Sequence, residues 1–113
     1  MPAPVSFFDG HNDFLLQLMM TQQPREERWL GIAGKGHLDL SRMKSAGFAG
    51  GLFAIFVPPR STGKPPDFKA AMAKPPYSMP MPPQMSHDQA QPDALTMAGL
   101  LHWMERSAPD DFR

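Results

Sequence analysis

The sequence predicts an α/β protein in which short strands alternate with helices. Residues 5–9 open as the β-prone run Val-Ser-Phe-Phe and end at the turn signal Asp9-Gly10. Residues 52–57 form a continuous apolar run closed by two prolines, as expected of a strand covered on both faces. A short helical segment lies between the two runs. This order predicts that the two strands are parallel neighbours.

The first predicted helix covers residues 14–20, which are mostly apolar and follow Asp13. Asp13 is a suitable N-cap, because a short carboxylate side chain can accept a hydrogen bond from the free amides of the first turn. Residues 21–36 are polar and then glycine-rich. We therefore expect a loop there, with one helical turn around residues 25–29.

The second predicted helix covers residues 42–46 and connects the two strands. Either Asp39 or Ser41 can cap its N-terminal amides. Gly47 suits the position after its last turn, where the backbone is often left-handed.

A third helix is predicted from Pro92, which suits a first helical turn, to about residue 106. The side chains on its expected apolar face are those of Ala94, Met97, Ala98, Leu101 and Met104. Thr96, His102 and Arg106 lie opposite and are expected to face solvent. A third strand should follow in an alternating pattern, and the sequence stops at Arg113 before supplying one.

Three regions are expected along the chain. Residues 1–57 hold the two strands with their helices, and residues 91–113 hold the amphipathic helix that leads toward the missing strand. Residues 58–90 contain most of the 14 prolines and several of the 10 methionines. Because proline removes backbone donors, this segment is expected to be a long, flexible loop.

Composition excludes several function classes. The 11 Lys and Arg residues balance the 11 Asp and Glu residues, which argues against a nucleic-acid partner. The absence of cysteine excludes disulfides, thiolate metal sites and thiol nucleophiles. The apolar runs are far shorter than the roughly 20 residues of a transmembrane helix, and the N-terminus does not read as a signal peptide. We therefore expect a cytoplasmic protein.

The chemistry-bearing feature is His11-x-Asp13 at the carboxyl end of the first strand. In extended backbone, residues i and i+2 project to the same side, so the imidazole and the carboxylate can reach one cation such as zinc. Ligands collect at this end of the strands in α/β folds. The alternative is that Asp13 merely caps the following helix while His11 sits in a turn.

The second such pattern, His37-x-Asp39, precedes the connecting helix, and there a capping role for Asp39 is favoured. His87 is expected to lie in the Pro/Met-rich loop. Trp29 and Trp103 are interpreted as packing residues. No nucleophile elbow, phosphate loop or dinucleotide fingerprint is present, and two ligands alone do not make a catalytic zinc site.

Residues 8–14, Phe-Asp-Gly-His-Asn-Asp-Phe, resemble the opening strand of the membrane dipeptidase (renal dipeptidase) family of zinc peptidases, which typically reads D-G-H-N-D-L. Residues 36–47 and 50–58 look like the first helix and second strand of that family, and the final helix, followed by Pro-Asp-Asp-Phe, is similar to the helix before its third strand. The resemblance spans most of the chain outside the Pro/Met-rich loop.

The resemblance implies a (β/α)₈ TIM barrel of the amidohydrolase type with a binuclear zinc centre. It also implies hydrolysis of dipeptides, many with a D-residue on the carboxyl side. His11 and Asp13 match two family ligands of the first metal. The bridging glutamate, the two histidines of the second metal and the acidic residue that handles the proton come from later strands, and they have no counterpart here.

Because such a barrel needs about 250 residues, we expect an N-terminal fragment of a metallodipeptidase that is inactive alone. The resemblance leaves a homodimer of the complete enzyme open. The competing interpretation is a non-enzymatic remnant that acts as an interaction module through its Pro/Met-rich loop.

Overall fold

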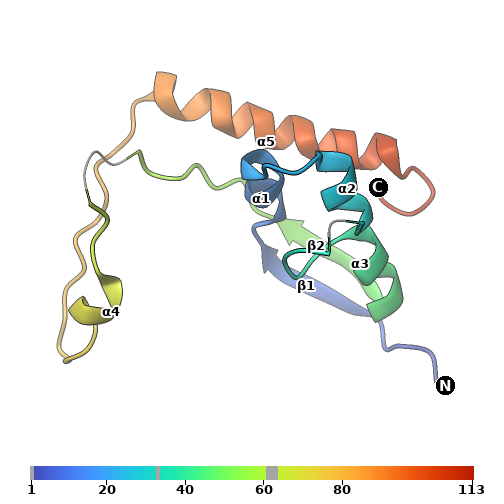
Figure 1. The fold of residues 1–113 in the computed structure, drawn as a ribbon, viewed down its shortest axis with the longest axis horizontal. Helices are drawn as coiled ribbons and strands as arrows, with labels where there is room; N and C mark the ends of the chain where they lie inside the picture. Colours follow the sequence, from blue (N-terminus) through green and yellow to red (C-terminus); the bar gives the residue numbers. More distant parts are fainter. Residues whose placement is uncertain (1, 33, 61–63) are drawn as a thin grey trace.

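The computed structural model describes residues 2–32, 34–60 and 64–113. It contains a strand–helix–strand unit on which a long C-terminal helix lies (Figure 1). The elements follow in the order β1 (Phe7–Asn12), α1 (Phe14–Met20), α2 (Arg25–Leu30), α3 (Leu40–Ala46), β2 (Phe48–Phe53), α4 (Phe68–Ala71) and α5 (His87–Ser107).

The predicted parallel pairing of the two strands is confirmed, but their boundaries differ from the prediction. β1 runs to Asn12 instead of ending at residue 9, and β2 begins at Phe48 instead of residue 52. Asn12 pairs with Phe53, and its carbonyl accepts a hydrogen bond from the amide of Ala54 at 2.9 Å. The chain then turns from β1 into α1, so residues 55–57 find no backbone partner in β1. The predicted and observed ranges of the second strand share only residues 52 and 53, because the limits of this strand depend on β1.

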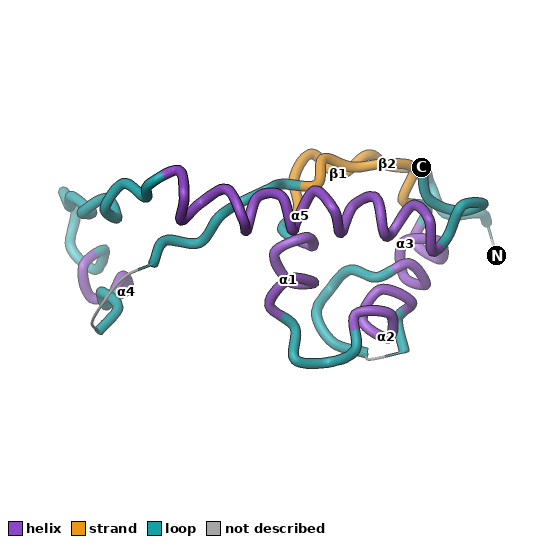
Figure 2. The backbone as a smooth tube through the Cα atoms, turned by 90° about the horizontal axis from the view of Figure 1, so that it is seen from above, coloured by secondary structure: helices purple, strands orange, loops and turns teal. Residues whose placement is uncertain are grey.

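The expectation that both faces of the strands are covered is not met within the described chain. Helices lie on one side of the sheet, and its other side is open in Figure 2. Phe8 and Leu52 are 64% and 60% exposed. The ring of Phe8 lies over Gly50, where a Cβ atom would come within 3.0 Å of it. The open face is therefore apolar.

The predicted connecting helix forms as α3, which begins two residues earlier than expected because Asp39, rather than Ser41, is its N-cap. The Asp39 carboxylate accepts a hydrogen bond from the amide of Arg42 at 2.8 Å. Gly47 ends the helix with a left-handed φ of 86°, and its carbonyl accepts a hydrogen bond from the amide of Phe7 at 3.1 Å. The end of α3 thus holds the start of β1 beside β2.

Helix α5 begins five residues before Pro92, which lies inside the helix instead of in its first turn. Ser86 and Gln89 form a capping box that starts the helix earlier. Its buried residues are Met97, Leu100 and Met104, so Leu100 is more deeply placed than the predicted face implies. No helix in the described ranges combines the length and the apolar character needed to cross a bilayer.

The Pro/Met-rich segment extends away from the rest of the chain in both views (Figures 1 and 2). It is not entirely loop, because it contains the short helix α4, capped by Asp67, and its last residues belong to α5. Residues 61–63 of this segment lie outside the described chain. An interaction role for the segment stays a prediction, as does the division of the chain into three regions.

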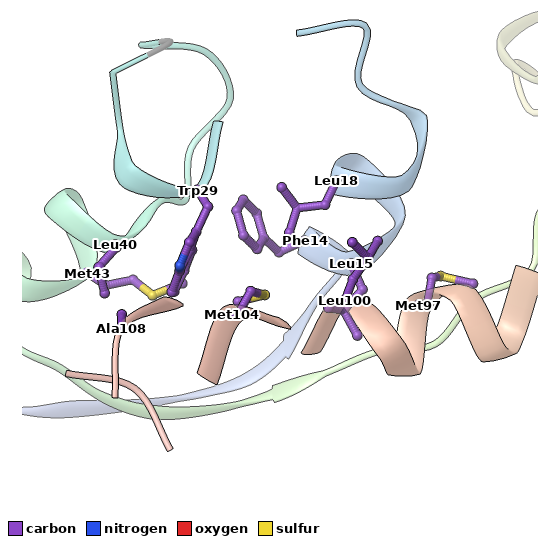
Figure 3. Packing of buried hydrophobic residues seen from close by; sticks show 10 residues of the cluster. All are labelled: Phe14, Leu15, Leu18, Trp29, Leu40, Met43, Met97, Leu100, Met104 and Ala108. Carbon is purple, nitrogen blue, oxygen red and sulfur yellow. The ribbon is translucent and has the colours of Figure 1, made fainter. Parts of the chain in front are cut away.

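One cluster of buried side chains joins the helices (Figure 3). Its members are Phe14, Leu15, Leu18, Trp29, Leu40, Met43, Met97, Leu100, Met104 and Ala108. Trp29 is completely buried, and its indole N–H donates a hydrogen bond to the hydroxyl of Ser107 at 2.8 Å. The interpretation of Trp29 as a packing residue is confirmed.

An aromatic chain continues from this cluster into the sheet. Its rings follow in the order Phe14, Trp29, Phe112, Phe53, Phe48 and Phe7, and neighbouring ring centroids lie between 5.2 and 6.3 Å apart. Tilted and edge-to-face pairs of this kind are favoured by the quadrupoles of the rings. The aromatic chain therefore connects α1, α2, the C-terminal residues, β2 and β1.

We predict that Trp29→Phe lowers the free energy of unfolding by about 1–2 kcal/mol, because the variant loses the hydrogen bond to Ser107 and part of a buried ring. Urea denaturation followed by circular dichroism measures the change. Trp103→Phe is the matched control, since Trp103 is only partly buried, and it should change the free energy less. An equal effect of both substitutions would contradict the central place given to Trp29.

Candidate metal centre

β1 and the start of α1 bring His11 and Asp13 together. His11 is the penultimate residue of β1, and Asp13 directly follows the strand. The Nε2 atom of His11 lies 3.3 Å from Oδ1 of Asp13, and the two side chains are 68% and 48% exposed. An imidazole nitrogen and a carboxylate oxygen therefore stand side by side, open to solvent, at the carboxyl end of β1.

Asp13 does not use its side chain to cap α1. It occupies the N-cap position, but its φ of −106° and ψ of 31° are not the extended values usual there, and its carboxylate makes no capping hydrogen bond. The side-chain oxygen of Asn12 instead accepts a hydrogen bond from the amide of Phe14 at 3.2 Å. The interpretation of Asp13 as a mere cap is therefore wrong, and its carboxylate is available for other partners.

The strand is irregular where these residues lie. Asp9 pairs with Gly51 and Asn12 pairs with Phe53, so β1 holds one more residue than β2 over this interval. Such a bulge redirects side chains and is common next to functional sites. The carboxylate of Asp9 spans the bulge, accepting hydrogen bonds from the amide of His11 at 3.2 Å and from the side-chain amide of Asn12 at 3.1 Å.

The second H-x-D pattern has the structural role that its sequence context favours. His37 is exposed in the loop before α3, whereas Asp39 is only 1% exposed. The Asp39 carboxylate is occupied by the amide of Arg42 at 2.8 Å and by the guanidinium Nε of the same residue at 2.6 Å. A buried carboxylate that caps a helix and pairs with arginine is not open to a metal ion.

The remaining histidines also stand next to carboxylates. His87, expected in the loop, is the first residue of α5 and lies 3.3 Å from Asp88. His102 lies 3.6 Å from Glu105 on the exposed side of the same helix. Among residues 2–32, 34–60 and 64–113, no group of three or more His, Cys, Asp or Glu side chains gathers to hold a metal ion.

Arg28 is a buried cation that the sequence reasoning missed. Its guanidinium donates hydrogen bonds to the carbonyl of Leu38 and to the side chain of Gln17, both at 2.8 Å, and lies 5.1 Å from the ring centroid of Phe14. Burial lowers the pKa of Arg28 from its usual value; the nearby Arg42 adds to this effect and Asp39 opposes it. Its contacts join the loop before α3 to α1, so its role is structural.

Asp9 and Asn12 were also missed as contributors to the site. The sequence did carry a signal, because Asp and Asn commonly bond the backbone two residues ahead of them. The amides of His11 and Phe14 are bonded in this way by Asp9 and Asn12, respectively. The sequence alone predicts only a turn for Asp9-Gly10 at the end of the strand.

Comparison with known proteins gives two solved structures that are similar over nearly the whole chain. One is dipeptidase AC, a metallopeptidase of family M19, with 55% sequence identity and a TM-score of 0.76 over 92% of this chain. The other is a metallopeptidase from Rhodobacter sphaeroides, solved with a phosphinate mimic of the dipeptide L-Ala-D-Ala, with 53% identity and a TM-score of 0.79 over 93% of this chain.

A curated protein, described as an uncharacterized protein in the PQQ-III 3′ region of Acinetobacter calcoaceticus, is 46% identical over 61 residues. Those residues are 53% of this chain and 19% of that relative. The chain spans 28% and 30% of the lengths of the two solved structures, so it corresponds to less than a third of each. No protein-family model matches the chain.

We predict stability effects of different size for the two H-x-D aspartates. Asp39→Ala should lower the free energy of unfolding by about 2 kcal/mol, because a buried cap and a charge-assisted hydrogen bond are lost together. Asp13→Ala should change it by less than about 0.5 kcal/mol, because an exposed ion pair contributes little. Urea denaturation of the two variants measures both. A large loss for Asp13→Ala would show that its carboxylate caps α1 after all.

Proposed function

We propose, from the membership of this chain in the M19 or membrane dipeptidase family of metallopeptidases, that it is the N-terminal part of a zinc-dependent dipeptidase. The observation that carries the proposal is the exposed His11–Asp13 pair at the carboxyl end of β1, in a chain 53–55% identical to solved metallopeptidases. The substrate class is that of dipeptides. A D-residue on the carboxyl side is supported by the L-Ala-D-Ala mimic bound to the Rhodobacter sphaeroides relative.

The donor atoms fit a zinc ion. Zinc accepts imidazole nitrogen and carboxylate oxygen, and both ligand types are exposed and adjacent here. A catalytic zinc site takes about three protein ligands and keeps an open position. His11 and Asp13 would therefore supply part of the first site of a binuclear centre. The bridging carboxylate and the further histidines would come from the part of the relatives that this chain does not cover.

Each of the two side chains has a definite task in this proposal. His11 and Asp13 would bind the ion at the carboxyl end of β1, which includes His11 and ends directly before Asp13. A bound zinc ion supplies Lewis-acid polarisation of the peptide carbonyl and activation of water. The group that moves the proton lies among the residues that the chain does not include, so we propose that the chain alone is inactive.

The edge of β2 that faces away from β1 supports a partial (β/α)₈ barrel. Within the described chain, β2 pairs only with β1, and a groove of about 390 Å³ runs along β2. Its lining includes Lys44, Phe48, Gly50, Leu52, Leu101 and Phe112. α5 follows β2 in the chain and borders this groove. A further parallel strand that follows α5 would therefore fill the groove beside β2, as in successive βα units.

We predict that zinc binds this chain weakly through His11 and Asp13. His11→Ala and Asp13→Ala should each abolish the binding, whereas His37→Ala should not change it. Metal analysis after equilibrium dialysis against zinc measures the bound ion. Loss of zinc in His37→Ala with retention in Asp13→Ala would mean that the wrong H-x-D was assigned.

We predict that dipeptide hydrolysis appears only when the rest of the barrel is supplied. Co-expression with the part of the Rhodobacter sphaeroides metallopeptidase that this chain does not cover provides the missing strands. The complex should hydrolyse L-Ala-D-Ala, and Asp13→Ala should reduce the rate at least about 100-fold because a metal ligand is lost. A complex that forms and hydrolyses the dipeptide equally well with Asp13→Ala would refute the assigned ligand.

A further inference from the structure

The His11–Asp13 pair depends on a short series of hydrogen bonds that runs alongside it. One carboxylate oxygen of Asp9 accepts from the amide of His11 at 3.2 Å, and the other accepts from the side-chain amide of Asn12 at 3.1 Å. The side-chain oxygen of Asn12 accepts from the amide of Phe14 at 3.2 Å. Asp9 thus connects through Asn12 to the first turn of α1.

The orientation of the Asn12 side chain is set by these partners. Its NH₂ group faces a carboxylate, and its oxygen faces a backbone amide. Turning the group over would place an oxygen against the carboxylate of Asp9 and an NH₂ against the N–H of Phe14, so both hydrogen bonds would be lost. Each member of the series therefore has one favourable arrangement.

The series has two effects on the candidate ligands. Asp9 bridges the bulge in β1, so the strand can include its extra residue without leaving the amide of His11 unpaired. Asn12 takes over the hydrogen bond that an N-cap side chain would make, so the carboxylate of Asp13 is not drawn to the amides of α1. Asp13 then lies 3.3 Å from His11.

We infer that Asp9 and Asn12 are positioning residues of the metal site: together they fix the end of β1 so that His11 and Asp13 present their ligand atoms to one cation. The inference rests on the proposed function for the identity of the site, and it assigns no metal contact to either residue. Outer partners of this kind typically change metal affinity by 10–100-fold when they are removed.

The test is a titration of the full 113-residue chain with Co²⁺, followed by NMR. Paramagnetic broadening of the His11 ring signals reports binding at this site, even when it is weak. His87 and His102 serve as internal controls, because each lies next to a carboxylate at 3.3 and 3.6 Å without such a series. In the unsubstituted chain His11 should broaden at lower Co²⁺ concentrations than either control.

Asp9→Ala and Asn12→Ala should each weaken Co²⁺ binding at His11 by about tenfold. The exchanged variant Asp9→Asn with Asn12→Asp should restore most of the affinity. In it, the side-chain amide of residue 9 can donate to the new carboxylate at residue 12, which still accepts from Phe14. Asp110→Ala, which removes an exposed carboxylate from the C-terminal turn, is the control for net charge and should leave the affinity unchanged.

The indole signal of Trp29, bonded to Ser107, shows in the same spectra that each variant is folded. Without metal, exchange of the Phe14 amide should be faster in Asn12→Ala, and exchange of the His11 amide should be faster in Asp9→Ala. Affinities that stay unchanged in both alanine variants, while Asp13→Ala abolishes binding, would overturn the inference and leave the proposed function intact. Weaker Co²⁺ binding in both alanine variants, with no recovery of affinity in the exchanged variant, would also overturn the inference. Binding that survives Asp13→Ala would instead overturn the proposed function.

Discussion

The position of the candidate site depends on the burial of Trp29. The Trp29 ring contacts Phe14 at the start of α1 and Phe112 near the C-terminus, and its N–H is bonded to Ser107 at the end of α5. Through Phe112 the aromatic chain reaches β2 and then β1. The two-stranded sheet is too small to be stable by itself. Contacts that fix α1 and the sheet relative to each other therefore also fix the turn between them, where His11 and Asp13 lie.

The parts of the fold that depend on residues close together in the sequence could be predicted from it. Helix α1 begins and ends where its apolar pattern does, and α3 lies between the cap Asp39 and the left-handed Gly47. The limits of β2 could not be predicted, because they depend on where β1 leaves the sheet. The Ser86–Gln89 capping box indicates the observed start of α5. The preference of proline for first helical turns instead predicts a start at Pro92, which is too late.

The two H-x-D patterns show why spacing alone does not identify a ligand pair. Arg42 lies three residues after Asp39. Its backbone amide and its guanidinium both donate hydrogen bonds to the Asp39 carboxylate. Asp13 is preceded by Asn12, which takes the cap and leaves the carboxylate free. The sequence allows a capping role for both aspartates. Which role each one has is decided by a neighbouring side chain, and for Asn12 that choice became visible only with the hydrogen bonds in place.

The extra residue that β1 contains between Asp9 and Asn12, next to the candidate metal ligands, makes the pairing of the two strands less regular. A chain without Gly10 would lose the irregularity between Asp9 and Asn12 without losing a side chain, although the irregularity between Phe7 and Phe8 would remain. Because strand side chains alternate, every residue before the gap would then face the other way relative to His11. Loss of one glycine, which carries no side chain, would therefore separate the histidine from the surroundings that orient it. A change in length at this point would therefore alter the candidate site even if none of its side chains were substituted.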